Sequence, residues 1–229
     1  MGIYDREEAL IGREALEGLH NSTVIVLGIG GVGSYVAEAL ARAGVGRLVL
    51  VDRDTVEETN INRQLVALHS TLGMPKALVM EKRILDIDPG CKVQGLVEFY
   101  NEETSGRVPF EGADYVVDAV DDVNAKVLIA LRARDAGVPC ISSMGTGNRL
   151  YADFLIDDIY KTSGCPLAKV MRQRLKKAGV EKLKVLYSKT VPGVRSATPA
   201  SISTVPSVAG LLIAGEVIRD IIEKQRKGH

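Results

Sequence analysis

Amide and guanidinium side chains gather just after the apolar run RLVLVD, residues 47–52. The group consists of Asn60, Asn62, Arg63 and Gln64, and Lys76 follows twelve residues after Gln64. A guanidinium group can fork onto phosphate oxygens, and amides can donate hydrogen bonds to phosphate or orient a metal ion. Two cations with several donors suit a triphosphate better than the pyrophosphate bridge of NAD. The alternative is a solvated loop that caps the next helix.

A glycine-rich motif, GIGGVG, precedes this group. Its glycines are Gly28, Gly30, Gly31 and Gly33, between an apolar run and a segment with helical periodicity. Glycines at this spacing let the backbone approach phosphate at a helix N-terminus. Asp52 follows Gly33 by 19 residues, close to the spacing of an acid that binds ribose. The motif suits NAD, FAD or ATP, and the polar group favours ATP. A tight turn without a ligand is the alternative.

Acidic residues end a later apolar run, in the stretch VVDAVDDVNAK. Asp118, Asp121 and Asp122 fall where a parallel strand ends, and carboxylates there can hold Mg²⁺ beside a triphosphate. Asp121 or Asp122 could instead cap the helix that begins near Asn124. We assign metal or catalytic work to Asp121.

Strands and helices that alternate along the chain must position these residues. Strands are expected at 23–28, 47–52, 92–99, 113–120 and 139–144, and helices at 32–44, 75–88 and 124–137. This order predicts an α/β fold, a Rossmann-like and mostly parallel sheet with flanking helices. After residue 145 we expect a C-terminal extension of strands and helices, at 147–160, 165–179, 182–188 and 207–225. The expected organisation is one domain over 1–229, with a nucleotide-binding core over 1–145 and a substrate-side extension over 146–229.

The combined pattern resembles the ubiquitin-activating-enzyme-like adenylyltransferases, the ThiF/MoeB group. It comprises G-x-G-G-x-G, D-x-D, N-x-x-R-Q, a Pro-Lys helix start and D-x-x-D, from residue 4 to about 145. The resemblance implies that MgATP binds and that a substrate carboxylate attacks the α-phosphate, giving an acyl adenylate and pyrophosphate. The implied nucleotide-binding residues are Gly28, Gly30, Gly31, Gly33, Asp52, Asp54, Asn60, Arg63, Gln64 and Lys76. The implied catalytic residues are Arg6, Arg63, Lys76 and Asp121, with Asp121 associated with Mg²⁺.

The family resemblance also implies an arginine supplied by a partner subunit. The stretch YDREEALIG places Arg6 in a short N-terminal helix, and Arg13 is the fallback. Because this arginine acts across subunits, a homodimer is expected. The resemblance further allows a monovalent cation, whose site the sequence does not place.

The second half of the chain resembles one branch of the family, the tRNA threonylcarbamoyladenosine dehydratases. The matching stretches are KTSGCPLAKVMR, RLKKAG, VLYS and SISTVPSVAGLLIAGEVI. Cys165 stands ahead of an expected helix, whose N-terminus can activate a thiol, so a nucleophilic role competes with simple packing. The branch usually has an acid at this position, and that departure argues against a role carried over from the family. The implied reaction adenylates the threonylcarbamoyl carboxylate on a tRNA adenosine, and ring closure then releases AMP.

The charge distribution agrees with an RNA substrate. Residues 161–189 hold nine basic residues and one acid, a net charge of +8, while the whole chain sums to zero. A basic segment on an acidic body fits the phosphate backbone of tRNA. Tyr160 and Tyr187 flank the segment and are candidates for stacking on a base. A solvated helix face is the alternative.

Other classes are less well supported. The sequence contains no C-x-x-C pair among Cys91, Cys140 and Cys165, so no structural zinc site is expected. We expect the three cysteines to be reduced thiols in the cytoplasm. No membrane segment is expected, because the longest uncharged stretch contains two prolines and many hydroxyls. The first rival hypothesis is an adenylyltransferase for a ubiquitin-like or sulfur-carrier protein, with a sulfur-relay partner. The second is an NAD-dependent oxidoreductase or a nucleotide-binding module without catalytic activity. Residues 190–204 are a candidate flap over the site.

Overall fold

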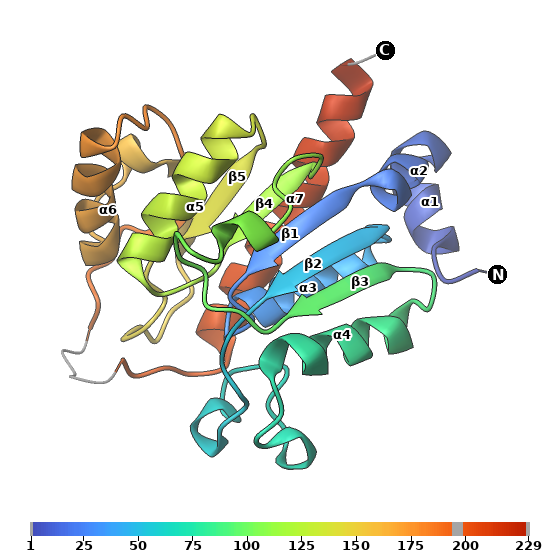
Figure 1. The fold of residues 1–229 in the computed structure, drawn as a ribbon, viewed down its shortest axis with the longest axis horizontal. Helices are drawn as coiled ribbons and strands as arrows, with labels where there is room; N and C mark the ends of the chain where they lie inside the picture. Colours follow the sequence, from blue (N-terminus) through green and yellow to red (C-terminus); the bar gives the residue numbers. More distant parts are fainter. Residues whose placement is uncertain (1, 194–198, 228–229) are drawn as a thin grey trace.

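One sheet of seven strands runs through the molecule (Figure 1). The computed structural model describes residues 2–193 and 199–227. The strands are β1 (Thr23–Leu27), β2 (Arg47–Val51), β3 (Lys92–Leu96), β4 (Tyr115–Asp118), β5 (Cys140–Ser143), β6 (Phe154–Asp158) and β7 (Lys184–Ser188). Their order is β3-β2-β1-β4-β5-β7-β6, and every neighbouring pair is parallel except β6 and β7. The predicted Rossmann-like fold is confirmed.

The central strands are mostly apolar because both faces of the sheet are covered. In β1, Val24 and Val26 join one hydrophobic cluster, while Ile25 and Leu27 join another on the opposite face. All four side chains are fully buried. Continuous apolar runs are typical of parallel strands covered on both faces. These runs are the reason why the strands could be predicted from the sequence.

Helices cover both faces. On one face lie α2 (Arg13–Asn21), α3 (Gly33–Arg42), α4 (Lys76–Ile87) and α7 (Thr204–Lys227), and α1 (Asp5–Ile11) packs on α2. On the other lie α5 (Val123–Asp135) and α6 (Pro166–Lys177). Short 3₁₀ turns occur at η1 (Glu58–Asn60), η2 (His69–Thr71), η3 (Ser105–Arg107) and η4 (Ile159–Lys161). Gly210 lets α7 approach α3 closely, since a Cβ there would lie 2.5 Å from the carbonyl oxygen of Val32.

One segment differs from the expectation. The third strand ends at Leu96 and not at residue 99, because the chain then leaves the sheet and folds over it. Tyr100, Val108 and Phe110 of that excursion are buried in the cluster beneath α5. Residues 147–160 hold one strand, β6, which pairs antiparallel with β7 at the sheet edge.

The candidate flap lies between β7 and α7, and its residues 194–198 lie outside the described residues. Asn148 binds both of its flanks. Its carbonyl oxygen accepts from Gly193 N at 3.0 Å, its own N donates to Ala200 O at 2.7 Å, and its Oδ1 accepts from Ala200 N at 2.7 Å. Asn148 has a φ of +60°, a conformation that asparagine tolerates better than most residues. No helix within the described ranges is long and apolar enough to cross a membrane.

Candidate functional site

A cavity of about 600 Å³ opens at the carboxyl ends of the parallel strands. Its wall is formed by the glycine motif, the segments after β2, β4 and β5, the loop around Arg63, and residues 199–206 before and at the start of α7. In open α/β sheets this is the edge at which ligands bind. The predicted glycine, acid and amide groups therefore meet in one place.

The glycine motif makes a turn that only small residues allow. Gly28 has a φ of +87°, and a Cβ at Gly33 would lie 1.7 Å from the carbonyl oxygen of Gly28. A Cβ at Gly31 would lie 3.1 Å from Pro206 of α7. At Gly30 the nearest atom to a Cβ would be Gln64 Nε2, at 3.8 Å, so Gly30 faces open cavity. The motif thus leaves bare backbone on the cavity wall where a phosphate could approach.

Asp52 ties β2 to the glycine motif. Its Oδ2 accepts from Ile29 N at 2.6 Å and its Oδ1 from Asp54 N at 2.8 Å. Burial raises the pKa of the Asp52 carboxyl above its ordinary value, although these two bonds and the charge of Lys76 act in the opposite direction. Each carboxylate oxygen can accept more than one bond, so ribose hydroxyls could still bind.

The two predicted cations both line the cavity. Lys76 is buried, and its Nζ lies 3.1 Å from Oδ2 of Asp54, whose side chain is 54% exposed. Arg63 Nη1 donates to Thr59 O at 2.7 Å and to Asn62 Oδ1 at 2.9 Å. Both cations are thus held at the wall by partners that are mostly open to solvent, which a phosphate could replace.

Two of the three predicted amides, Asn60 and Gln64, do different work. Asn60 is buried, and its Oδ1 accepts from Glu57 N at 3.1 Å and so caps the 3₁₀ turn η1 in which it lies. Gln64 is also buried on the cavity wall, but its Oε1 has no hydrogen-bond partner within the described part of the chain. An unsatisfied buried oxygen is costly, and a bound ligand or water would satisfy it. Gln64 therefore fits a ligand site.

The three acids after β4 separate into three roles. Asp122 caps α5, because its Oδ1 accepts from Ala125 N at 2.7 Å. Asp118 is buried in an ion pair with Lys126. Asp121 is exposed and lies on the cavity wall. Asp122 also lines the cavity, but of the three only Asp121 neither caps a helix nor pairs with a lysine, which leaves it for a ligand or a metal ion.

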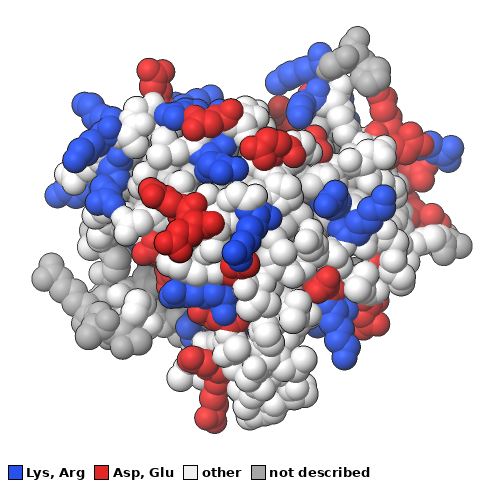
Figure 2. Space-filling view, viewed as in Figure 1, with Lys and Arg blue, Asp and Glu red and all other residues white. Residues whose placement is uncertain are grey.

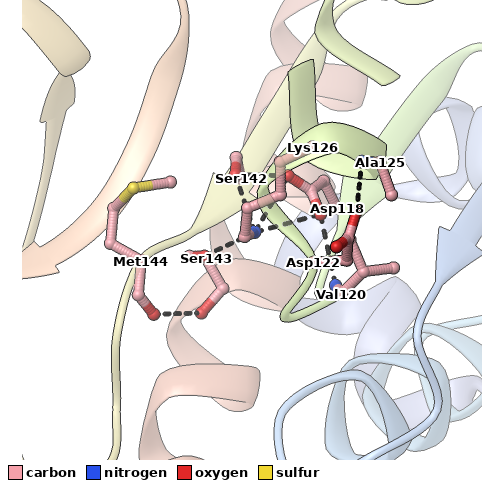
Figure 3. A network of polar contacts seen from close by, with 8 residues as sticks. All are labelled: Asp118, Val120, Asp122, Ala125, Lys126, Ser142, Ser143 and Met144. Carbon is pink, nitrogen blue, oxygen red and sulfur yellow. Dashed lines mark hydrogen bonds and ion pairs between the residues drawn. The ribbon is translucent and has the colours of Figure 1, made fainter. Parts of the chain in front are cut away.

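A buried polar network lies at the carboxyl ends of β4 and β5 (Figure 3). Lys126 Nζ contacts Asp118 Oδ1 at 3.1 Å, Asp118 Oδ2 at 3.0 Å and Ser142 Oγ at 3.2 Å. It also donates to Ser143 O at 2.8 Å. Through Lys126 the network joins the end of β4, at Asp118, to the end of β5, at Ser142 and Ser143. Asp118 Oδ1 also accepts from Val120 N at 3.2 Å, which fixes the backbone next to Asp121.

A metal ion would have few protein ligands here. In residues 2–193 and 199–227, no three His, Cys, Asp or Glu side chains gather closely enough to hold one. Mg²⁺ beside a nucleotide usually binds one or two carboxylates together with phosphate oxygens and water. Asp121 lies on the wall of the same cavity as Gln64, whose Oε1 has no partner among the described residues, and this arrangement fits that kind of site.

The N-terminal arginines do not reach the cavity of their own chain. Arg6 is exposed on α1, and α1 lies on α2, which leads into the amino end of β1 (Figure 1). Arg13 pairs with Glu8 at 3.0 Å and lines a separate hollow of about 240 Å³ beside α7. Either arginine could meet the cavity only in a second copy of the chain.

Several residues on the wall were missed in the sequence. Arg53 lies with its guanidinium carbon 4.2 Å from the centre of the Phe99 ring, and both line the cavity. Residues 145–147, just after β5, line it too. The rule that ligands bind beyond the carboxyl ends of strands would have found residues 145–147. Nothing in the sequence pairs Arg53 with Phe99.

The basic segment, residues 161–189, presents part of the cationic surface expected from the sequence. Figure 2 shows lysine and arginine side chains gathered over α6, where Lys169, Lys176 and Lys177 are exposed. Lys184, however, is engaged with Glu216 at 2.8 Å and with Asp220. Tyr187 is 2% exposed and belongs to the core, so the prediction that it could stack on a base is wrong. It packs inward because alternate side chains of β7 face α6.

Cys165 precedes the first turn of α6. It is buried in the hydrophobic cluster between α5, α6 and β7. Cys91 is buried as well, and burial raises the pKa of its thiol to about 11. The three cysteines are all unpaired thiols. These surroundings are those of packing residues and not of nucleophiles.

Comparisons with known proteins agree with this geometry. A model of the ThiF family matches residues 4–228. The chain is 45% identical to the tRNA threonylcarbamoyladenosine dehydratase of Bacillus subtilis, over 96% of this chain and 94% of that relative. A sulfur carrier protein adenylyltransferase of Thermus thermophilus is 34% identical over 60% of this chain and 51% of its own length. The solved structure of E. coli tRNA N6-threonylcarbamoyladenosine dehydratase in complex with ATP matches with a TM-score of 0.93 and 31% identity, covering 99% of this chain and 96% of that one.

Proposed function

This chain belongs to the ThiF family, and from that premise we propose that it is an ATP-dependent tRNA threonylcarbamoyladenosine dehydratase. It joins the threonylcarbamoyl carboxylate of a tRNA adenosine to the AMP portion of ATP and releases pyrophosphate. A group of the same modified nucleoside then closes a ring and displaces AMP. The net change in the nucleoside is the loss of one water.

The observation that carries this proposal is the composition of the cavity wall. It combines bare backbone at Gly30, the buried cation of Lys76 and the guanidinium of Arg63, and beside them Gln64 Oε1 is an acceptor without a partner among the described residues. Displacement at a phosphate builds negative charge on the phosphate oxygens, and donors placed in advance lower that barrier. Similarity over nearly the whole length of a dehydratase supports this substrate in preference to a carrier protein.

The residues divide the work by position. Asp52 binds the ribose, and Gly30 with its neighbours lies along the phosphates. Arg63 and Lys76 neutralise the phosphates and the charge that develops on the leaving group. Mg²⁺, when bound, would supply further charge neutralisation, and Asp121 is the residue that would hold it. No enzyme nucleophile is required, in accord with the burial of Cys165.

The tRNA is bound through the basic segment, residues 161–189. The exposed lysines of α6 and the neighbouring Lys182 and Lys189 supply the cationic surface. Contacts of this kind act on phosphates and carry little sequence information. Residues 146–229 thus form the substrate side of one functional unit, whose sheet they share through β6 and β7.

The active enzyme is a cytoplasmic homodimer. The cavity contains neither Arg6 nor Arg13 of its own chain, so a second copy would supply one of them. A monovalent cation and a sulfur-relay or carrier-protein partner are further expectations from the family resemblance.

The decisive experiment incubates the protein with MgATP and tRNA that carries threonylcarbamoyladenosine. We expect AMP formation that depends on this tRNA, together with a nucleoside lighter by one water in mass spectrometry. Unmodified tRNA is the control and should yield no AMP. ATP–pyrophosphate exchange that depends instead on a small carrier protein would support the adenylyltransferase alternative and contradict this proposal.

A further inference from the structure

Among the tyrosine and phenylalanine side chains of the described residues, the most exposed one stands on a loop that leaves the cavity wall. Tyr151 is 76% exposed, and its neighbour Leu150 is 65% exposed. They stand on the loop between β5 and β6, which starts from the cavity wall at residues 145–147. Since a residue spans at most about 3.6 Å, Tyr151 lies within roughly 14 Å of Gly147.

The loop that carries Tyr151 is anchored on both sides. Arg149 is buried, and it donates from Nε to Gly145 O at 3.3 Å and from Nη1 to Ser188 Oγ at 2.8 Å. Arg149 Nη1 also donates to Thr190 O at 2.5 Å. On the other side, Asp153 Oδ1 accepts from Ser188 Oγ at 2.8 Å. An exposed ring held between such anchors loses little conformational freedom when it binds a partner.

The other exposed aromatic rings are already engaged. The guanidinium of Arg53 covers one face of Phe99. Tyr160 is 37% exposed, and its hydroxyl donates to Val180 O. No ring contact or cation–π contact is found for Tyr151 among the described residues, so its face is open.

The chemistry of the proposed reaction creates a need for such a ring. An enzyme that acts on a base takes that base out of its stack, which leaves the neighbouring base without a partner. Proteins that bind single-stranded RNA supply aromatic side chains on which such bases stack. Lys189 and Lys161, both exposed, lie at the two ends of the basic segment whose last strand, β7, carries the Ser188 anchor of this loop.

We propose that Tyr151, with Leu150 beside it, is a stacking platform for the unpaired tRNA base next to the adenosine that enters the cavity. The inference rests on the proposed function and adds a specific surface to it. The aromatic face recognises a base, whereas the lysines of α6 recognise phosphate. The two contributions therefore differ in their dependence on salt.

The test compares Tyr151→Ala, Tyr151→Phe and Tyr151→Leu in the full chain. Binding of tRNA that carries threonylcarbamoyladenosine is measured by fluorescence anisotropy at several salt concentrations, and AMP release is measured by steady-state kinetics. We expect Tyr151→Ala to weaken binding about 5- to 150-fold, with a matching rise in KM for tRNA. Tyr151→Phe should stay within about twofold of wild type, and Tyr151→Leu should fall between them, because it keeps apolar area but not the ring.

The salt dependence separates stacking from charge. In Tyr151→Ala the slope of log affinity against log salt should match that of the wild type, whereas Lys176→Ala should lower the slope by about one. KM for ATP should be unchanged in all Tyr151 variants. Equal tRNA affinity of Tyr151→Ala and wild type would overturn the platform while leaving the proposed function intact. A wild-type protein that neither binds this tRNA nor forms AMP with it would overturn both. A Tyr151→Ala variant that changes its oligomeric mass instead would identify a subunit contact and overturn the platform.

Discussion

Lys76 and Lys126 are both buried lysines paired with an aspartate, but only Lys76 lines the cavity. Lys76 Nζ lies 3.1 Å from Asp54, whose side chain is 54% exposed, whereas Lys126 Nζ lies 3.0 Å from Asp118, whose side chain is 1% exposed. Water can solvate Asp54 once its lysine is gone, so Lys76→Met should lower the free energy of unfolding by about 1 kcal/mol or less. Lys126→Met leaves a buried carboxylate without its cation, and about 3–5 kcal/mol should be lost.

The same two substitutions should act on activity in a different way. Lys76→Met removes a cation that would meet the phosphates, and the loss of one well-aimed donor costs on the order of 100-fold in turnover. This factor corresponds to about 2.7 kcal/mol of transition-state stabilisation. Urea unfolding and AMP release with tRNA as substrate should therefore change separately. Lys76→Met stays folded but turns over on the order of 100-fold more slowly, while Lys126→Met unfolds at a much lower denaturant concentration.

Lys76→Arg is the control, since it keeps the charge and should recover part of the turnover. Near-normal AMP release by Lys76→Met would refute the phosphate-binding role. An unfolding midpoint of Lys76→Met as low as that of Lys126→Met would show that Lys76 is a structural residue, whatever its effect on rate.

Three further substitutions probe other parts of the molecule. Asp121→Asn should raise the Mg²⁺ concentration needed for half-maximal AMP release at least about tenfold with unchanged unfolding; an unchanged Mg²⁺ requirement would contradict the assignment. Cys165→Ala should keep turnover within a few-fold of wild type and lose about 1 kcal/mol of stability, whereas a nucleophile would lose far more activity than that. Burial opposes the ionisation of Glu38, but hydrogen bonds from Arg83 and Arg42 outweigh it and hold its pKa below the ordinary value. Stability from Glu38 is thus present at neutral pH and lost in acid, as the pH falls below the ordinary pKa of a glutamate, about 4.3. The free energies of unfolding of Glu38→Gln and wild type, measured in urea, should differ by about 1 kcal/mol at pH 7 and converge in acid. A difference that stays constant with pH would refute the direction of the pKa shift.

The sequence predicted the features that depend on neighbours along the chain. Parallel strands covered on both faces read as unbroken apolar runs, and the glycine motif joins a strand to a helix within a few residues. Asp52 was found by its distance from Gly33, because a crossover of one helix fixes that spacing. Asp122 as a helix cap was one of two alternatives, and three-dimensional structure was needed to choose it over Asp121.

Contacts between distant segments could not be predicted in the same way. Lys126 reads as one more charged residue in a helix, and only the pairing of β4 with β5 brings Ser142 and Asp118 to it. Asn148 binds Ala200, and Arg149 binds Ser188, across about forty to fifty residues. Such bonds depend on the order of strands in the sheet, and local periodicity does not specify that order.

Arg63 and Lys76, the two cations on the cavity wall, are held in place by partners that a ligand could replace at a small cost in free energy. Arg63 is aimed by Thr59 O and Asn62 Oδ1, and Asn62 in turn donates to the carbonyl oxygen of Ser201, another residue of the cavity wall, at 3.1 Å. Because these partners are exposed or neutral, a phosphate can displace them without leaving a charge buried and unpaired. Lys126 shows the opposite arrangement, in which every partner is buried and exchange would be costly. Under the proposed function, the cation that serves structure and the cations that serve a ligand differ in the exposure of the groups that hold them.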